Sequence, residues 1–145
     1  MKIGSVMFLI FSYQTENKER IKEALWKTLG NVISEAQVEE VALQGHYGDV
    51  ITEIKYMFKG KAGEHVLNAL ISKLDKSDVI YLLSTLQDRV DGSKIHIRLD
   101  KQVLVAMNKL AIKDGDDVVK VVINTAGNVT GIKEELKKVA SGDLH

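Results

Sequence analysis

Cysteine and proline are both absent from this chain of 145 residues. Without cysteine the chain has no disulfide framework, no thiolate nucleophile and no cysteine-bound zinc or iron–sulfur site. A cysteine-free sequence suits a reducing compartment, and we therefore expect a cytoplasmic protein. Average usage would give about seven prolines at this length, so the turns must be formed by Gly, Asn, Asp or Ser.

Net charge and long apolar runs are also lacking. Lys plus Arg and Asp plus Glu number 20 each, so the formal net charge is zero. Proteins that capture nucleic acid by bulk electrostatics usually carry an excess of basic residues. The longest apolar run, residues 6–11, has six residues, whereas a membrane-spanning helix needs about 20. We therefore expect no membrane partner.

The composition is that of a globular domain, because 45% of the residues are apolar and 28% are charged. Residues 1–145 fit a single domain. The pattern predicts an α+β fold, a two-layer sandwich with helices on one face of a mixed β-sheet. Residues 101–110 are compatible with either a strand or a short helix. Apolar periodicity predicts strands over residues 2–12, 39–44, 50–59, 94–100 and 118–123. It predicts helices over 17–29, around an apolar stripe at 66–74, around a second stripe at 79–90 that Asp75 or Ser77 would cap, and from 128 onward.

No catalytic signature is present in the sequence. The acidic run 114–117 lacks the spacing of an ion-binding loop, so a solvated turn is favoured and no metal or cofactor is expected. A hydrolase that uses His46 with Asp49 or Asp100 is a minor alternative, because no nucleophile, base and orienting group occur together. We expect a protein that is not an enzyme.

The turn Gly-His-Tyr-Gly at residues 45–48 is the most unusual local feature. Glycine permits a positive φ and a close backbone approach, and His46 and Tyr47 could stack on a base or donate hydrogen bonds to it. A tight hairpin with Tyr47 packed on the edge of the core would have the same sequence. The pattern alone favours that structural interpretation.

A row of outward side chains is the second candidate. Residues 94–100 alternate strictly between polar and apolar, so Lys94, His96 and Arg98 would point outward about 6.5–7 Å apart. The row would continue to Lys101 and Gln102, with a spacing near that of phosphates along a single strand. The solvated face of an ordinary sheet alternates in the same way, and the pattern alone favours that interpretation.

Three motifs occur in one order: Gly-His-Tyr-Gly at 45–48, Ile-Arg-Leu-Asp-Lys-Gln at 97–102 and Asp-Asp-Val-Val-Lys-Val at 116–121. With these motifs the chain resembles an archaeal family of predicted exosome subunits or RNA-binding proteins over nearly its whole length. The resemblance implies a fold like that of the large-subunit ribosomal protein L-five and a role in RNA processing. It also implies that the 45–48 turn and residues 98–102 meet in space.

The leading hypothesis is a non-catalytic RNA-binding protein of RNA processing or the exosome, with weak to moderate affinity because few phosphates could be neutralised. Basic side chains would contact phosphates, and the turn would contact unpaired bases. The alternative is an assembly subunit without direct RNA affinity, in which an exposed strand pairs with a partner protein or with a second copy as a homodimer. The expected RNA-binding residues are His46, Tyr47, Lys94, His96, Arg98, Lys101 and Gln102.

Overall fold

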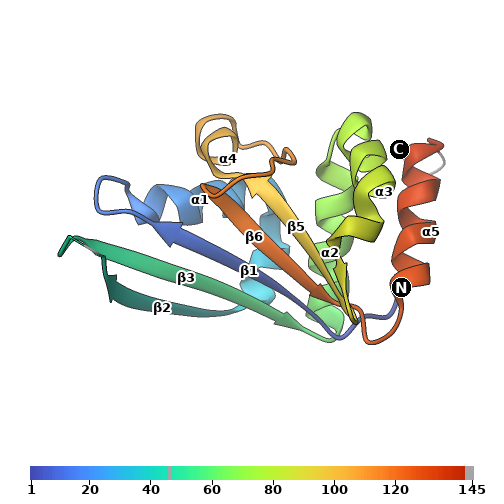
Figure 1. The fold of residues 1–145 in the computed structure, drawn as a ribbon, viewed down its shortest axis with the longest axis horizontal. Coiled ribbons are helices and arrows are strands. Elements are labelled where there is room, and N and C mark those ends of the chain that lie inside the picture. The colour runs from blue at the N-terminus through green and yellow to red at the C-terminus, as the bar shows by residue number, and fades with distance from the viewer. Residues whose placement is uncertain (46, 143–145) are drawn as a thin grey trace.

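The computed structural model describes residues 1–45 and 47–142. A six-stranded sheet forms one layer and helices form the other (Figure 1), which confirms the expected α+β fold. The elements are β1 (Ser5–Ser12), α1 (Lys18–Leu29), a 3-10 helix η1 (Gly30–Glu35), β2 (Gln37–Gln44), β3 (Val50–Lys59), α2 (Lys61–Lys73), α3 (Lys76–Arg89), β4 (Val90–Asp91), β5 (Lys94–Asp100), α4 (Lys101–Met107), β6 (Val118–Asn124) and α5 (Val129–Ala140).

The strands lie in the order β2-β3-β1-β6-β5-β4, and every neighbouring pair is antiparallel. The sequence predicted a mixed sheet, and the difference has a topological cause. β1 runs parallel to β2 and to β5, but β3 is inserted between the first two strands and β6 between the others. Strands of the same direction are therefore never adjacent in the described sheet, and each ladder has the antiparallel hydrogen-bond pattern.

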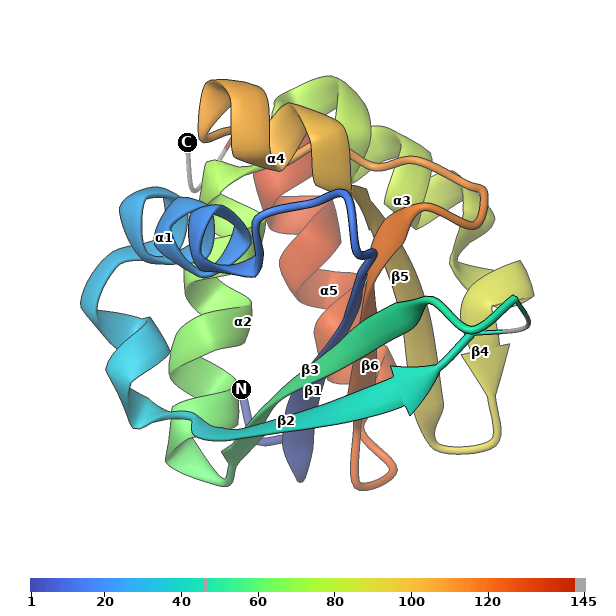
Figure 2. The ribbon, with the colours of Figure 1, turned by 90° about the vertical axis from the view of Figure 1, so that its left-hand side faces the viewer.

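The buried face of the sheet follows directly from strand alternation. Val6, Phe8 and Ile10 of β1 are fully buried, and Ile54 and Phe58 of β3 lie on the same side. The helix layer covers this side, as Figure 2 shows with the sheet in front. Over residues 1–45 and 47–142, every helix is too short or too polar to cross a bilayer.

Helix α1 shows why the local sequence sets these boundaries. The Asn17 side chain accepts a hydrogen bond from the backbone N–H of Glu19 and caps the first turn. Gly30 ends the helix with φ of 78°, a conformation that residues with a Cβ rarely adopt. Ile21 and Leu25 lie on one helical face and are buried in the hydrophobic core.

Lys101 is the largest departure from the sequence-based expectation, because its side chain is only 1% exposed. Its Nζ donates hydrogen bonds to the carbonyl oxygen of Phe11 (3.0 Å) and to Oε1 of Glu16 (2.8 Å), and it lies 2.5 Å from Oδ1 of Asp117. It also lies 4.8 Å from the ring centroid of Tyr13. The prediction that Lys101 continues the outward basic row is wrong.

The cause of this departure is the end of β5. The Asp100 side chain accepts a hydrogen bond from the backbone N–H of Val103, and α4 begins there instead of a longer strand. Because Lys101 is the first residue of this helix, the two-residue alternation of the strand no longer determines the direction of its side chain. Of the two alternatives for residues 101–110, the structure has the short helix.

The charges around Lys101 stabilise its ionised form. Burial lowers the pKa of Lys101, but the hydrogen bonds that Lys101 donates to Asp117 and Glu16 outweigh burial and leave the pKa above its ordinary value. Burial raises the pKa of Asp117, and the hydrogen bonds from Lys101 and Gln102 outweigh it, so that pKa lies below its ordinary value. The cluster is therefore an ion pair over the whole neutral range.

We expect Lys101→Met to lower the free energy of unfolding by about 2–3 kcal/mol, below the roughly 3–5 kcal/mol typical of a fully buried pair. The expected loss is smaller than for a fully buried pair because Glu16 and Asp117 remain partly exposed to water. Urea denaturation measures the change. The matched control is Lys27→Met, whose ion pair with Glu23 is exposed, and this variant should change stability by less than about 0.5 kcal/mol. Equal losses in both variants would contradict the anchoring role of Lys101.

The depressed pKa of Asp117 predicts an acid dependence. A carboxyl group whose folded pKa lies below its unfolded pKa stabilises the fold above the unfolded pKa, and this stabilisation is lost as the pH falls through the folded value. From about pH 5 down to about pH 2, the native chain should therefore lose more stability than Asp117→Asn. Urea midpoints across this range give the comparison, and parallel curves would refute the pairing.

Candidate nucleic-acid interface

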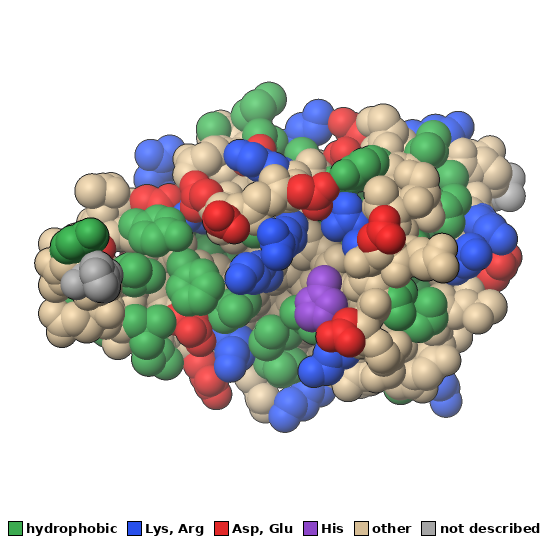
Figure 3. Space-filling view, viewed as in Figure 1, with side chains coloured by type: hydrophobic (Ala, Val, Ile, Leu, Met, Phe, Trp, Pro, Cys, Tyr) green, Lys and Arg blue, Asp and Glu red, His purple; other side chains and the backbone are tan. Residues whose placement is uncertain are grey.

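The described helices leave one face of the sheet uncovered (Figures 1 and 2). This open face carries the side chains that alternate with the buried ones, and the strand registers align them into cross-strand rows. In Figure 3 apolar and basic side chains lie next to each other on this face. Its residues on the four central strands include Met7, Leu9 and Phe11 of β1, Lys55 and Met57 of β3, Lys120 and Val122 of β6, and Lys94, His96 and Arg98 of β5.

One row across the open face is strongly basic. Arg98 lies directly opposite Lys120, Lys120 opposite Leu9, and Leu9 opposite Lys55. Like charges directly opposite each other in a sheet are destabilising. Among the described residues, no carboxylate forms an ion pair with Arg98 or Lys120. The row is thus a cationic surface, and a bound anion would reduce the electrostatic repulsion between Arg98 and Lys120.

Arg98 and Lys120, two cations of this row, are positioned by their surroundings. Nη1 of Arg98 donates a hydrogen bond to the carbonyl oxygen of Gly115 (2.7 Å), which fixes the guanidinium beside the 113–117 loop. Nζ of Lys120 lies 5.9 Å from the ring centroid of Phe11. Guanidinium groups have five donors, so one hydrogen bond leaves Arg98 able to bind a further acceptor.

The expected outward column on β5 is present as a geometric feature. Lys94, His96 and Arg98 are all exposed, and they alternate with buried Ile95 and Ile97. A hollow of about 300 Å³ lies between β5, β6 and β1, and His96, Arg98 and Lys120 line it. The column ends at Asp100, because Lys101 is buried and Gln102 lies on α4.

Gln102 is exposed but is already engaged. Its Nε2 donates to Oδ2 of Asp117 (3.0 Å) and lies 3.5 Å from Oε2 of Glu16. Gln102 therefore helps to hold the carboxylates around Lys101, and it lies beside the open face instead of on it.

The 45–48 turn joins β2 to β3, as the sequence predicted. His46 lies outside the described residues, and Tyr47 has 92% of its surface exposed. Oε1 of Gln14 accepts a hydrogen bond from the backbone N–H of Val50 (3.0 Å) next to this turn. The 13–17 loop contacts the hairpin through Gln14 and the start of α4 through Glu16, so it lies between the turn and residues 98–102.

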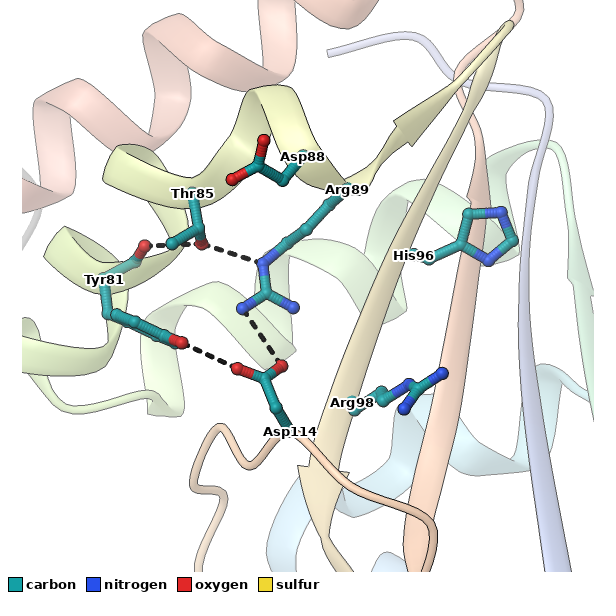
Figure 4. Close-up of a pocket in the computed structure, with 7 residues that line it drawn as sticks. All are labelled: Tyr81, Thr85, Asp88, Arg89, His96, Arg98 and Asp114. Carbon is teal, nitrogen blue, oxygen red and sulfur yellow. Dashed lines mark hydrogen bonds and ion pairs between the residues drawn. The ribbon is translucent and has the colours of Figure 1, made fainter.

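A pocket of about 320 Å³ lies beside the open face, between α3, β5 and the loop before β6 (Figure 4). The hydroxyl of Tyr81 donates to Oδ2 of Asp114 (2.6 Å), and Nη2 of Arg89 lies 3.4 Å from Oδ1 of the same carboxylate. Nε of Arg89 donates to Oγ1 of Thr85 (2.9 Å). The positive charge of Arg89 is thus already balanced inside the pocket.

These contacts also shift the ionisation of the pocket. The hydrogen bond from Tyr81 lowers the pKa of Asp114, and the same bond raises the pKa of Tyr81. Asp114 is therefore ionised and committed to two donors at neutral pH. The pocket is a structural network, and the cations able to meet an anion lie on the open face.

A family model described as RNA binding matches residues 5–125. The chain belongs to this RNA-binding family. No curated protein matches it.

Solved structures with similar folds come from archaea. A DUF54 protein of Sulfolobus solfataricus has 33% identity and a TM-score of 0.86, over 96% of this chain and 98% of that one. A DUF54 protein of Archaeoglobus fulgidus has 24% identity and a TM-score of 0.75, over 93% and 99% of the two chains. One from Methanothermobacter thermautotrophicus has 19% identity and a TM-score of 0.72, over 97% and 99%. The last two show the fold alone, and the first also supports membership of the RNA-binding family.

Lys120 and Lys55 are the site residues that the sequence reasoning missed. Both occupy outward positions of strands that were predicted, so alternation alone could have placed them on the outward face. Their position next to Arg98 and Leu9 depends on which strands pair, and no local pattern specifies that.

Lys120→Gln should raise the free energy of unfolding by about 0.2–1 kcal/mol, because it removes the like charge opposite Arg98. The gain should shrink at high salt, which screens exposed charges. Urea denaturation at two ionic strengths measures both effects. Lys55→Gln is the matched control on the same face: Lys55 lies opposite Glu39, so its loss should not stabilise the fold. A destabilised Lys120→Gln would contradict the repulsion.

Proposed function

We propose that this protein binds RNA through the open face of its sheet. The observation that carries the proposal is the pair Arg98 and Lys120, which lie directly opposite each other and form no ion pair with a carboxylate of the described residues. Membership of the RNA-binding family supports the same function. Phosphate oxygens are the anions that guanidinium and ammonium groups meet on nucleic acid.

Each kind of side chain on the open face has a distinct part in this proposal. Arg98, Lys120 and Lys94 neutralise phosphates and position the strand. Phe11 and His96 offer ring surfaces for unpaired bases, which stack on aromatic side chains without strong sequence preference. The flat mixture of rings and cations favours single-stranded RNA, because A-form duplexes are recognised largely through their 2′-hydroxyls and phosphates.

The expected affinity is modest. The chain has zero net charge, and only a few cations lie on the open face. Affinity for nucleic acid and its dependence on salt both scale with the number of phosphates neutralised. We therefore expect micromolar binding instead of the tight capture shown by strongly basic proteins.

The proposal extends to a non-catalytic role in RNA processing. The resemblance to predicted exosome subunits, and to the fold of ribosomal protein L-five, supports a place in such an assembly. His96 lines a hollow with cations and apolar groups on the open face, and it also lines the neighbouring pocket with Asp88 and Asp114. Asp114 is committed to Tyr81 and Arg89. A cytoplasmic location stays a prediction from the cysteine-free sequence.

The 45–48 turn remains a predicted second contact. Tyr47 is highly exposed at the tip of the β2–β3 hairpin, on the same sheet as Arg98 but with the 13–17 loop between the two. A long single strand would have to cross the 13–17 loop to reach both. Tyr47→Ala should weaken binding through lost stacking, about 1–3 kcal/mol per base, without changing the salt dependence.

Fluorescence anisotropy with a mixed-sequence single-stranded RNA at several salt concentrations tests the proposal. The native chain should bind in the micromolar range and weaken as salt rises. Arg98→Ala/Lys120→Ala should lower the affinity at least about tenfold and reduce the slope of log affinity against log salt by about 1.4, which corresponds to two contacts.

The matched control is Lys133→Ala/Lys138→Ala on α5, which removes the same charge from exposed positions in the helix layer. It should leave the slope nearly unchanged. If both double variants lost affinity equally, binding would be nonspecific. If the native chain bound no RNA at low salt, the proposal would be refuted.

A further inference from the structure

The two edges of the sheet are built differently. At one edge β4 has only two residues, and beyond it residues 111–113 cover β5. The backbone N–H of Asp100 donates to the carbonyl oxygen of Ala111 (2.8 Å), and that of Lys113 donates to the carbonyl oxygen of Arg98 (3.0 Å). Short strands and covering loops are the usual means of blocking an edge against other chains.

The opposite edge, β2, has none of these protections. All eight residues of Gln37–Gln44 are exposed, and each pairs with β3 in an unbroken register without a bulge. The strand contains no lysine and no proline. Val38, Val41 and Leu43 have 48%, 47% and 37% of their surface exposed. A long, regular edge with apolar side chains is a template for pairing with another strand.

The backbone groups that face outward from β2 follow from its pairing with β3. The N–H of Gly45 donates to the carbonyl oxygen of Asp49 (2.6 Å), so odd-numbered positions of β2 direct their backbone groups toward β3. The alternation of an antiparallel ladder then directs the N–H and C=O groups of the even-numbered positions away from the sheet. The outward-facing positions are Val38, Glu40, Ala42 and Gln44.

The charges on β2 are compensated within the chain and do not block this edge. Glu40 forms ion pairs with Lys18 (3.2 Å) and Lys22 of α1. Glu39 lies opposite Lys55 of β3 on the open face. A neighbouring strand would therefore meet a nearly neutral edge.

We propose that β2 pairs antiparallel with β2 of a second copy of this chain, about a two-fold axis at Val41. The two six-stranded sheets then form one continuous sheet. In this register Val41 lies opposite its own copy, Glu40 opposite Ala42, Glu39 opposite Leu43, and Val38 opposite Gln44.

The sequence of β2 selects this register over its neighbours. A two-fold axis normal to the sheet keeps side chains of the same face opposite each other, so the axis can lie only at a residue. An axis at Glu40 puts two like charges directly opposite, which is destabilising. An axis at Ala42 shortens the paired segment to residues 40–44. Only the axis at Val41 pairs seven residues of β2 without opposing like charges.

The same symmetry places both open faces on one side of the continuous sheet. Arg98 and Lys120 of each copy would then belong to one extended surface. The self-pairing does not depend on RNA binding, because it is argued from the backbone and charges of β2 alone.

Light scattering of the native chain over a range of protein concentrations should show a rise from 16.1 kDa toward twice that mass. Val41→Glu should weaken dimerisation at least about tenfold, because it puts two carboxylates at the axis. The matched control is Val50→Glu, a residue of equal type and nearly equal exposure on β3, which lies between β2 and β1 and is not an edge strand. This variant should dimerise like the native chain, and circular dichroism confirms that both variants are folded.

Single cysteines test the register, since the chain has no cysteine of its own. Val41→Cys should form an intermolecular disulfide readily, because Cα atoms of a non-hydrogen-bonded pair lie about 4.5 Å apart, within disulfide range. Leu43→Cys should not, because its own copy lies four residues further along the strand, about 13 Å away.

Three results would overturn the proposal. The first is a native chain that stays monomeric at every concentration. In that case the partner of the β2 edge would be an extended segment of another protein. The second is a dimer that Val41→Glu does not weaken. The third is cross-linking of Leu43→Cys as fast as Val41→Cys.

Discussion

The buried ammonium group of Lys101 is the constraint on which the end of the sheet depends. A charge taken out of water costs several kcal/mol unless it is paired and hydrogen-bonded. The pairing here requires the end of β1, the 13–17 loop and the residue before β6 to converge on one atom through Phe11, Glu16 and Asp117. The Asp100 cap ends β5 and begins α4, and this directs Lys101 to the point of convergence. The convergence also places the start of β6 beside the end of β1.

That arrangement determines which cations become neighbours. With β6 between β1 and β5, Lys120 lies between Leu9 and Arg98 on the open face. A carboxylate or an apolar residue opposite Arg98 would make the sheet more stable than Lys120 does. In the RNA-binding function that we propose, this unfavourable pair of charges is retained for a ligand. The pocket near Tyr81 shows the contrast, because Asp114 there already neutralises Arg89.

Alternation and capping predicted most of the elements. Strand β5 was predicted over its full length with the correct outward residues, and α1, capped by Asn17 and Gly30, lies within the predicted range 17–29. Both are local signals, set by side chains within one or two turns of the chain. The prediction failed at Lys101, since strand and helix are both compatible with the local sequence. The burial of its charge depends on Glu16, which is 85 residues away in sequence.

The sequence by itself determined the fold class, the absence of thiol chemistry and the outward positions of Lys94, His96 and Arg98, because composition and two-residue alternation are properties of short segments. Tertiary structure alone decided that the sheet is antiparallel throughout its described strands. It also decided that Lys120 faces Arg98, that Lys101 is buried, and that β2 is a fully exposed edge. Those features depend on which strands become neighbours, and strand order is set by packing between distant segments of the chain.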